Sequence, residues 1–269
     1  TIGSISGPSS AWRDLKVFGT YMYIVSEGGG GIQVVDMSQV DSGIVTQLGS
    51  VTTGGTQASH NVAIDTVSGF LYRAGGGSNG IRAYDLNASP TNPPFVGSWS
   101  NNYVHDVQVV TFTSGPNAGK QIAYCSTGGS GTLATVDVTN KANMVTMDSI
   151  GYPNSGYSHQ SWLSDDGRYC YLNDEFDEPP LPTQTYVFDV LDPNNIVYLG
   201  VFSNGNTAIG HNGYVRGNYL YEANYRSGLR VFDIGASKTN PPESAWLDTY
   251  PANDNANYSG LWSCYPLFP

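Results

Sequence analysis

Short segments of alternating apolar and polar residues recur along the whole chain, separated by turns rich in glycine, serine and asparagine. Alternation with a period of two residues is typical of β-strands, and no segment shows helical periodicity over a useful length. The segments come in groups of four, and each group spans about 45 residues. Four short antiparallel strands in a repeat of this length are the sequence signature of a β-propeller blade.

Each strand of the group has a recognisable pattern. The first follows a polar loop, as in Asn61–Asp65. The second carries an aromatic signature, which reads Y-M-Y at 21–23, F-L-Y at 70–72, I-A-Y at 122–124, Y-C-Y at 169–171 and Y-L-Y at 219–221. The third ends in aspartate, in I-Q-V-V-D at 32–36, I-R-A-Y-D at 81–85, L-A-T-V-D at 133–137, T-Y-V-F-D at 185–189 and L-R-V-F-D at 229–233. The fourth is a further alternating segment, such as V-Y-L-G-V-F at 197–202.

The position that opens the first strand, which we call the slot, holds all four histidines of the chain. The slot residues are Arg13, His60, His105, His159, His211 and Trp262. Six slots predict a six-bladed β-propeller that forms a single domain over residues 1–269. The segment T-I-G-S-I-S-G at 1–7 resembles a fourth strand, so we expect it to complete the last blade and close the ring. No second or third strand follows Trp262, so we expect that last blade to be incomplete.

Composition and charge narrow the range of partners. The chain contains 33 glycines and 19 tyrosines among its 269 residues, which suits a β-rich protein with many tight turns. Its net charge of −11 argues against nucleic acid and anionic membranes, because both attract basic surfaces. No apolar stretch approaches the length of a transmembrane helix. We therefore expect no nucleic-acid partner and no membrane span.

The third strands resemble the LVIVD repeat, and the wider pattern is similar to the choice-of-anchor B family of bacterial surface proteins. The stretches that carry the resemblance are A-W-R-D-L-K-V at 11–17, G-Y-P-N-S-G-Y-S-H-Q at 151–160, N-D-E-F-D-E at 173–178 and A-N-Y-R-S-G-L-R at 223–230. The resemblance covers essentially the whole chain. It implies a bacterial β-propeller that is extracellular, at the cell surface or periplasmic, and it implies no particular biochemical activity.

The histidines are the leading candidates for a functional site. The first strand of each propeller blade lines the central channel, so we expect His60, His105, His159 and His211 to converge at one mouth of that channel. Neutral imidazoles suit Zn, Cu or Fe, whereas Ca²⁺ prefers oxygen ligands. The pattern predicts a divalent transition metal held by these residues. Two alternatives stay open, namely a hydrated polar channel and a metal-free site in which the histidines contact a ligand directly.

Other polar residues are expected on the same face as the histidines. They are Arg13, Glu27, Asp106, Asp174, Glu175, Tyr225 and Arg226. Carboxylates and an arginine beside a metal can support acid–base work or hold an anionic group. The alternative for the acidic run at 174–178 is a solvated loop, and for Arg226 it is packing. The oxygen-rich segment N-D-N-A-N at 253–257 is a candidate for a loosely held surface Ca²⁺.

The sequence thus predicts an extracellular or cell-envelope metal-binding propeller with its site at the channel mouth. Whether the site also catalyses a reaction is open. A small molecule, a glycan or a protein is the expected ligand at that face. The competing hypothesis is a non-catalytic recognition module that binds a glycan or a protein, because tyrosine-rich surfaces stack on sugars and anchor interfaces.

Overall fold

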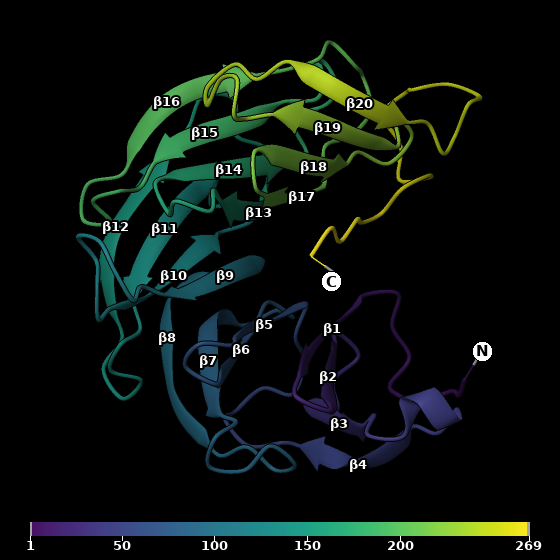
Figure 1. Ribbon diagram of the computed structural model, residues 1–269, viewed down its shortest axis with the longest axis vertical. Coiled ribbons are helices and arrows are strands. Elements are labelled where there is room, and N and C mark those ends of the chain that lie inside the picture. Colours follow the sequence, from purple (N-terminus) through teal and green to yellow (C-terminus); the bar gives the residue numbers. More distant parts are fainter. Residues whose placement is uncertain (1, 268–269) are drawn as a thin grey trace. The chain divides into compact units, whose positions relative to one another are not determined.

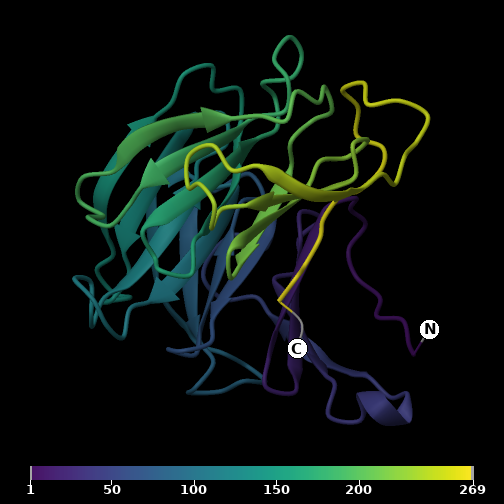
Figure 2. The ribbon, with the colours of Figure 1, turned by 45° about the horizontal axis from the view of Figure 1, so that its top comes forward.

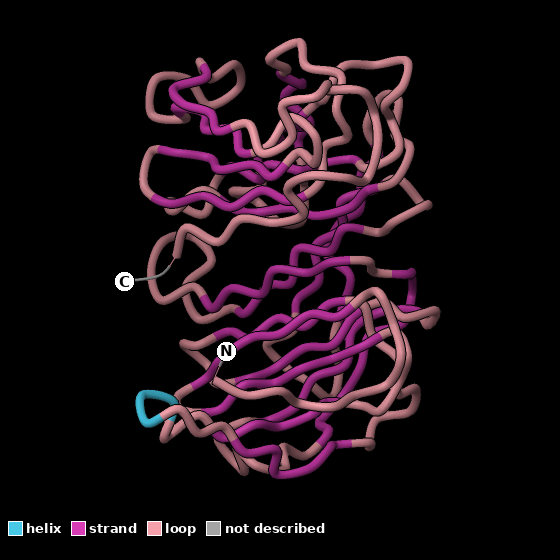
Figure 3. The backbone as a smooth tube through the Cα atoms, turned by 90° about the vertical axis from the view of Figure 1, so that its right-hand side faces the viewer, coloured by secondary structure: helices cyan, strands magenta, loops and turns pink. Residues whose placement is uncertain are grey.

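The computed structural model describes residues 2–267, which belong to two compact units. The first unit comprises residues 1–123 and 136–145, and the second comprises 124–135 and 146–269. Strands dominate both units, and the one helical element among the described residues is the short 3₁₀ turn η1 (Val40–Ser42; Figure 3). The described part contains no helix whose length and hydropathy would let it cross a membrane.

The first unit contains two complete antiparallel sheets. Their strands follow the chain order in each sheet (Figure 1). They are β1 (Arg13–Phe18), β2 (Tyr21–Ser26), β3 (Ile32–Asp36) and β4 (Thr46–Val51), then β5 (Asn61–Asp65), β6 (Phe70–Ala74), β7 (Asn79–Asp85) and β8 (Phe95–Tyr103).

A third sheet of the same order lies at the boundary between the units, which passes through its strands. It consists of β9 (Asp106–Thr111), β10 (Gln121–Ser126), β11 (Thr132–Asp137) and β12 (Val145–Gly151). The second unit contains two further sheets. They are formed by β13 (Ser158–Leu163), β14 (Tyr169–Asp174), β15 (Thr185–Asp189) and β16 (Val197–Phe202), then by β17 (Asn212–Arg216), β18 (Tyr219–Ala223), β19 (Leu229–Asp233) and β20 (Glu243–Leu247).

These strands confirm the periodicity of the sequence. Every aromatic signature lies in the second strand of a sheet, and every aspartate-ended segment lies in the third. In the first unit the opening strands β1, β5 and β9 are neighbours, and in the second unit β13 lies beside β17. The fold is therefore all-β and of the β-propeller class, with four-stranded antiparallel blades.

The number of blades differs from the sequence prediction, because the described residues form five blades and not six. Trp262 does occupy a sixth slot, but the segment around it makes only an isolated bridge between Leu261 and Tyr225. A blade needs a second and a third strand to satisfy the backbone of the first, and the described residues after β20 form no strand. After β20 the chain instead forms a long loop, drawn in yellow in Figure 2.

The prediction that residues 1–7 form a closing strand is also wrong for residues 2–7. Thr1 lies outside the described residues. Residues 2–12 contain no strand. The Gln33 side chain of β3 donates a hydrogen bond to the carbonyl of Ser6 at 2.7 Å. The N-terminal segment is thus held by the first blade, and its alternating residues do not form a β-strand paired with a neighbour.

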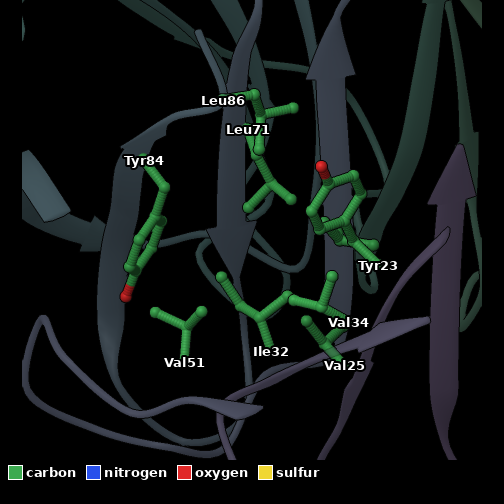
Figure 4. Packing of buried hydrophobic residues seen from close by; sticks show 9 residues of the cluster. Tyr23, Val25, Ile32, Val34, Val51, Leu71, Tyr84 and Leu86 are labelled. Carbon is green, nitrogen blue, oxygen red and sulfur yellow. The ribbon is translucent and has the colours of Figure 1, made fainter. Parts of the chain in front are cut away.

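The core explains the aromatic signature. In the first unit Tyr23 and Tyr84 pack with valine, leucine and isoleucine side chains from the first two blades (Figure 4). The hydroxyl group of Tyr23 donates to the carbonyl of Pro90 at 2.8 Å, and that of Tyr171 donates to the carbonyl of Lys238 at 3.2 Å. Tyr23 and Tyr171 thus bury their rings between two blades and satisfy their hydroxyl groups on a loop of the following blade, which a phenylalanine could not do.

Candidate functional site

Two slot histidines meet in the second unit. His159 lies in β13 and His211 directly precedes β17, and their ring centroids are 4.2 Å apart. His159 Nδ1 lies 2.9 Å from the carbonyl oxygen of His211, and His211 Nδ1 lies 2.5 Å from that of Trp262. A carbonyl oxygen only accepts, so Nδ1 carries the proton in both rings. His159 and His211 therefore each donate to the backbone of the next slot, and this bond fixes the tautomer of each ring.

With Nδ1 protonated, the Nε2 lone pair of each ring is the available metal-binding group. Both Nε2 atoms face the carboxylate of Glu175, at 3.7 Å for His159 and 3.5 Å for His211. One donor atom from each of the three residues lies within 4.8 Å of the others. Metal–ligand bonds of about 2.1 Å in a tetrahedral site place two donors about 3.4 Å apart. The two His–Glu separations, each to a different oxygen of Glu175, are close to this value, and we call these residues the His–His–Glu triad.

The surroundings of Glu175 shift the pKa of its carboxyl group. Burial raises the pKa of its carboxyl group to about 7, the hydrogen bond from Tyr225 opposes this rise, and the nearby Asp174 adds to it. The Tyr225 hydroxyl group donates to Glu175 at 2.8 Å, and burial raises the pKa of that tyrosine well above its usual value. The Tyr225 ring packs against His211 at 4.6 Å. A carboxyl group with a pKa near neutrality can bind a metal or exchange a proton at physiological pH.

Asp174, a candidate binding residue from the sequence, anchors a loop in the structure. Its side chain is fully buried and accepts four hydrogen bonds. The donors are the Tyr152 hydroxyl group (2.7 Å) and the backbone amides of Gly156 (2.9 Å), Tyr157 (2.7 Å) and Phe176 (3.0 Å). Asp174 thereby holds the loop that leads into His159 and the turn that presents Glu175.

The acidic run at 174–178 is not a solvated loop. Asp174, Asp177 and Glu178 are buried, Glu175 is largely buried, and only Phe176 is exposed. The solvated-loop alternative rested on the tendency of charged clusters in turns to face water. The loop that follows the run is held by a backbone bond, since Thr183 donates its amide to the carbonyl of Asn206 at 2.8 Å.

The first unit brings together the other two slot histidines. The ring centroids of His60 and His105 are 3.9 Å apart, and His60 Nδ1 lies 2.7 Å from the carboxylate of Glu27. Gly75 permits this arrangement, because a Cβ atom there would lie 2.5 Å from the Cβ atom of His60, and its φ of +72° also favours glycine. Each unit thus brings two of the slot histidines into ring contact.

Glu27 and Glu175 occupy equivalent positions in the repeat. Each follows the last tyrosine of its aromatic signature by four residues, and Tyr225 does the same in the last blade. In each unit this glutamate faces the slot histidine of the following blade, Glu27 facing His60 and Glu175 facing His211. The equivalence is visible in the sequence and would have separated Glu175 from the other acids of its run.

The residues after the slots connect neighbouring first strands. Their side-chain oxygens accept hydrogen bonds from the backbone of the next blade, and the contacts are Val62 N to Asp14 (3.0 Å), Val107 N to Asn61 (3.3 Å) and Gly213 N to Gln160 (2.8 Å). In the first unit the Asn61 amide also donates to Asp14 and to Asp106, at 3.0 Å each. Asp106, a candidate binding residue, therefore belongs to this hydrogen-bond network.

We expect Asp106 to make the first unit less stable as the pH rises. Burial raises the pKa of its carboxyl group to about 8, the neighbouring Asp14 adds to the rise, and Lys16 opposes it. The folded protein thus retains a proton that the unfolded chain releases near pH 4, so the free energy of unfolding falls between about pH 4 and pH 8, by a few kcal/mol. Asp106→Asn should flatten this decline in urea unfolding curves, whereas the exposed Asp41→Asn should leave it unchanged. An unchanged slope in Asp106→Asn would contradict the assignment.

Arg13 and Arg226 contact backbone and loop groups near them. Arg13 donates to the carbonyl of Pro8. Arg226 donates to the side chain of Asn253 at 2.7 Å and lies over the ring of Tyr250, with 4.8 Å to the centroid. Within the segment 253–257, the Asp254 carboxylate accepts a hydrogen bond from Asn206 at 2.9 Å. Arg226 thus holds the loop after β20, as the packing alternative expects, and the surface Ca²⁺ at 253–257 stays a prediction.

Sequence reasoning missed several contributors to the triad's surroundings. Trp262 supplies a backbone carbonyl to His211, and its ring lies 5.6 Å from that histidine. Tyr258 packs edge-on against Tyr225 at 5.3 Å. Trp262 was identified as a slot residue, but no sequence signal separates Tyr258 from the other eighteen tyrosines.

The comparisons with known proteins agree with the repeat and the fold. Residues 5–44 and 214–249 match the LVIVD repeat family, so the repeat is present in the first and last blades. The sequence matches none of the curated proteins. The choice-of-anchor B resemblance finds no support in these comparisons.

Solved structures share the fold at low sequence identity. A protein from Lactobacillus plantarum is 16% identical with a TM-score of 0.65, over 90% of this chain and 68% of that one. Putative 6-phosphogluconolactonases from Bacteroides fragilis and Bacteroides uniformis are 15% and 17% identical, with TM-scores of 0.63 and 0.64, and each match covers 87% of this chain and 70% of the other. At such identities the similarity concerns the fold alone.

Proposed function

We propose that this protein is a metal-binding β-propeller and that His159, His211 and Glu175 hold a divalent transition metal. The observation that carries the proposal is the pair of Nδ1–carbonyl hydrogen bonds, which turn both Nε2 atoms toward one carboxylate. Metal-binding histidines in proteins are oriented by the same kind of bond.

The ligand set narrows the choice of metal to Zn, Fe or Cu. Two imidazoles and one glutamate are a ligand set of catalytic zinc sites, and with open positions they also suit non-haem Fe(II). Three protein ligands leave at least one position for water or for a further ligand. We assign no reaction to that position. The location that we propose, outside the cytoplasm of a bacterium, rests on the sequence resemblance to surface proteins.

Zinc titration of chelator-treated protein tests the triad. We expect one equivalent to bind tightly at neutral pH, and we expect His211→Ala, His159→Ala and Glu175→Gln each to weaken binding by about 100-fold or more, because three ligands act on one ion. Glu27→Gln is the matched control, since it changes the equivalent glutamate of the first unit and should leave the affinity unchanged. Unaltered binding in all three triad variants would contradict the proposal.

The same titration separates the triad from the four-histidine site predicted from the sequence. His105→Ala removes one of the four histidines and none of the triad. A site in which His105 is one of the ligands predicts that this variant binds much more weakly, whereas the triad alone predicts unchanged affinity.

Exposed aromatic side chains favour a recognition module as the second candidate function. Phe176, Tyr258 and Trp262 are each about half exposed and lie beside residues of the site, Phe176 packing on Tyr157 and the other two on Tyr225. Such rings can stack on a glycan or anchor a protein. Elemental analysis separates the two functions, because a stoichiometric transition metal supports the first, while a metal-free protein that stays folded supports the second.

A further inference from the structure

Two adjacent carboxyl groups of the second unit are buried without a counter-charge. Asp177 and Glu178 are 5% and 6% exposed. Asp177 Oδ1 and both carboxyl oxygens of Glu178 are buried and have no hydrogen-bond donor. Among the described residues, no lysine, arginine or histidine forms an ion pair with either group. Burial of such oxygens without a partner costs several kcal/mol, so the fold retains them against a clear penalty.

The two carboxyl groups face each other and not the solvent. Burial and the neighbouring Asp177 both raise the pKa of the Glu178 carboxyl group, so the two groups act on each other at short range. One further oxygen, Asp177 Oδ2, accepts a hydrogen bond from the Tyr186 hydroxyl group at 2.8 Å, which fixes the aspartate. Two carboxylates at this distance repel each other unless a proton or a cation lies between them.

A third oxygen borders the same place. A Cβ atom built on Gly210 would lie 3.7 Å from Glu178 Oε1 and 3.4 Å from the backbone carbonyl of Asp174. Such a Cβ atom would make ordinary van der Waals contacts, so these two oxygens and the Cγ2 atom of Thr183 border Gly210. Carboxylates and backbone carbonyls in a flexible arrangement are the donors that Ca²⁺ prefers, whereas Mg²⁺ demands a stricter geometry and keeps several waters.

We propose that Asp177 and Glu178 form a second cation site of this protein, which takes a hard, oxygen-loving divalent cation, Ca²⁺, with the carbonyl of Asp174 as a third donor. The site is distinct from the His–His–Glu triad in its residues and in its ligand chemistry. A cation there would compensate both carboxylates and would hold the loop at 175–183 against the segment at 206–210, which Thr183 already contacts through the carbonyls of Asn206 and Ala208.

Calcium titration of chelator-treated protein at neutral pH, followed by calorimetry, tests this site. We expect one Ca²⁺ per chain with a dissociation constant between about 10⁻⁶ and 10⁻³ M, and a rise in melting temperature on saturation. Asp177→Asn and Glu178→Gln should each weaken binding by about 100-fold and abolish the rise in melting temperature. Both variants keep the size of the side chain and can still hydrogen-bond, and the far-UV circular dichroism spectrum checks that they fold.

Two control variants locate the calcium. Glu175→Gln should bind Ca²⁺ as the wild type does, so failure of the transition-metal proposal and failure of this one are distinguishable. Asp254→Asn, in the oxygen-rich segment at 253–257, should also leave binding unchanged. The inference is overturned if the wild type binds no Ca²⁺, or if Asp254→Asn abolishes binding while Glu178→Gln retains it.

Discussion

At pH 5 the protein is expected to bind zinc at least about 1,000-fold more weakly than at pH 7.5. Each Nε2 atom of the triad must be free of a proton to bind the metal, and free imidazole takes up that proton near pH 6.5. Lowering the pH to 5 therefore costs about 30-fold in affinity for each histidine. The pKa of Glu175, raised to about 7 by burial, adds a third proton that the metal must displace.

Competition with a chromophoric zinc indicator at a series of fixed pH values measures this dependence. Glu175→Gln removes one of the three titrating ligands, so its residual binding should depend less steeply on pH. An affinity that is constant between pH 7.5 and pH 5 would show that carboxylates of ordinary pKa hold the metal in place of the triad.

The second large effect is expected at Asp174. Its replacement by alanine should lower the free energy of unfolding by about 3–5 kcal/mol, because four buried donors, one hydroxyl group and three backbone amides, lose their acceptor together. The loop into His159 would then lose its anchor, so zinc affinity should fall as well. Thermal and urea unfolding measure the first effect, and the zinc titration measures the second.

Asp174→Asn and Asp41→Ala complete this test. Asparagine keeps the volume and one acceptor oxygen, so it should cost clearly less than alanine. Asp41 is exposed, and its replacement should leave unfolding unchanged. A cost below about 1 kcal/mol for Asp174→Ala would mean that other contacts hold the loop.

The sequence by itself determined the strands and their roles. Period-two alternation is a local property, so segments such as Asn61–Asp65 and Thr185–Asp189 appear in the structure as the pattern predicts. The repeat also places the slot histidines at the start of first strands, and equivalent positions of neighbouring blades lie side by side. The aromatic signature is also a local property of the sequence, and it marks the second strand of each blade.

The tertiary structure alone decided the number of blades and the chemistry of the site. The slot at Trp262 matches the repeat, but a blade forms only where three further strands can hydrogen-bond in sequence, and this is a non-local condition. Which imidazole nitrogen faces Glu175 depends on a bond from His159 to a carbonyl 52 residues away. The division of the acidic run, in which Asp174 anchors a loop and Glu175 faces the histidines, depends on which donors the folded chain brings to each oxygen. The repeat position of Glu175 is visible in the sequence, but the tautomers of the histidines and the four hydrogen bonds to Asp174 are decided by rotamers and long-range contacts of the folded chain.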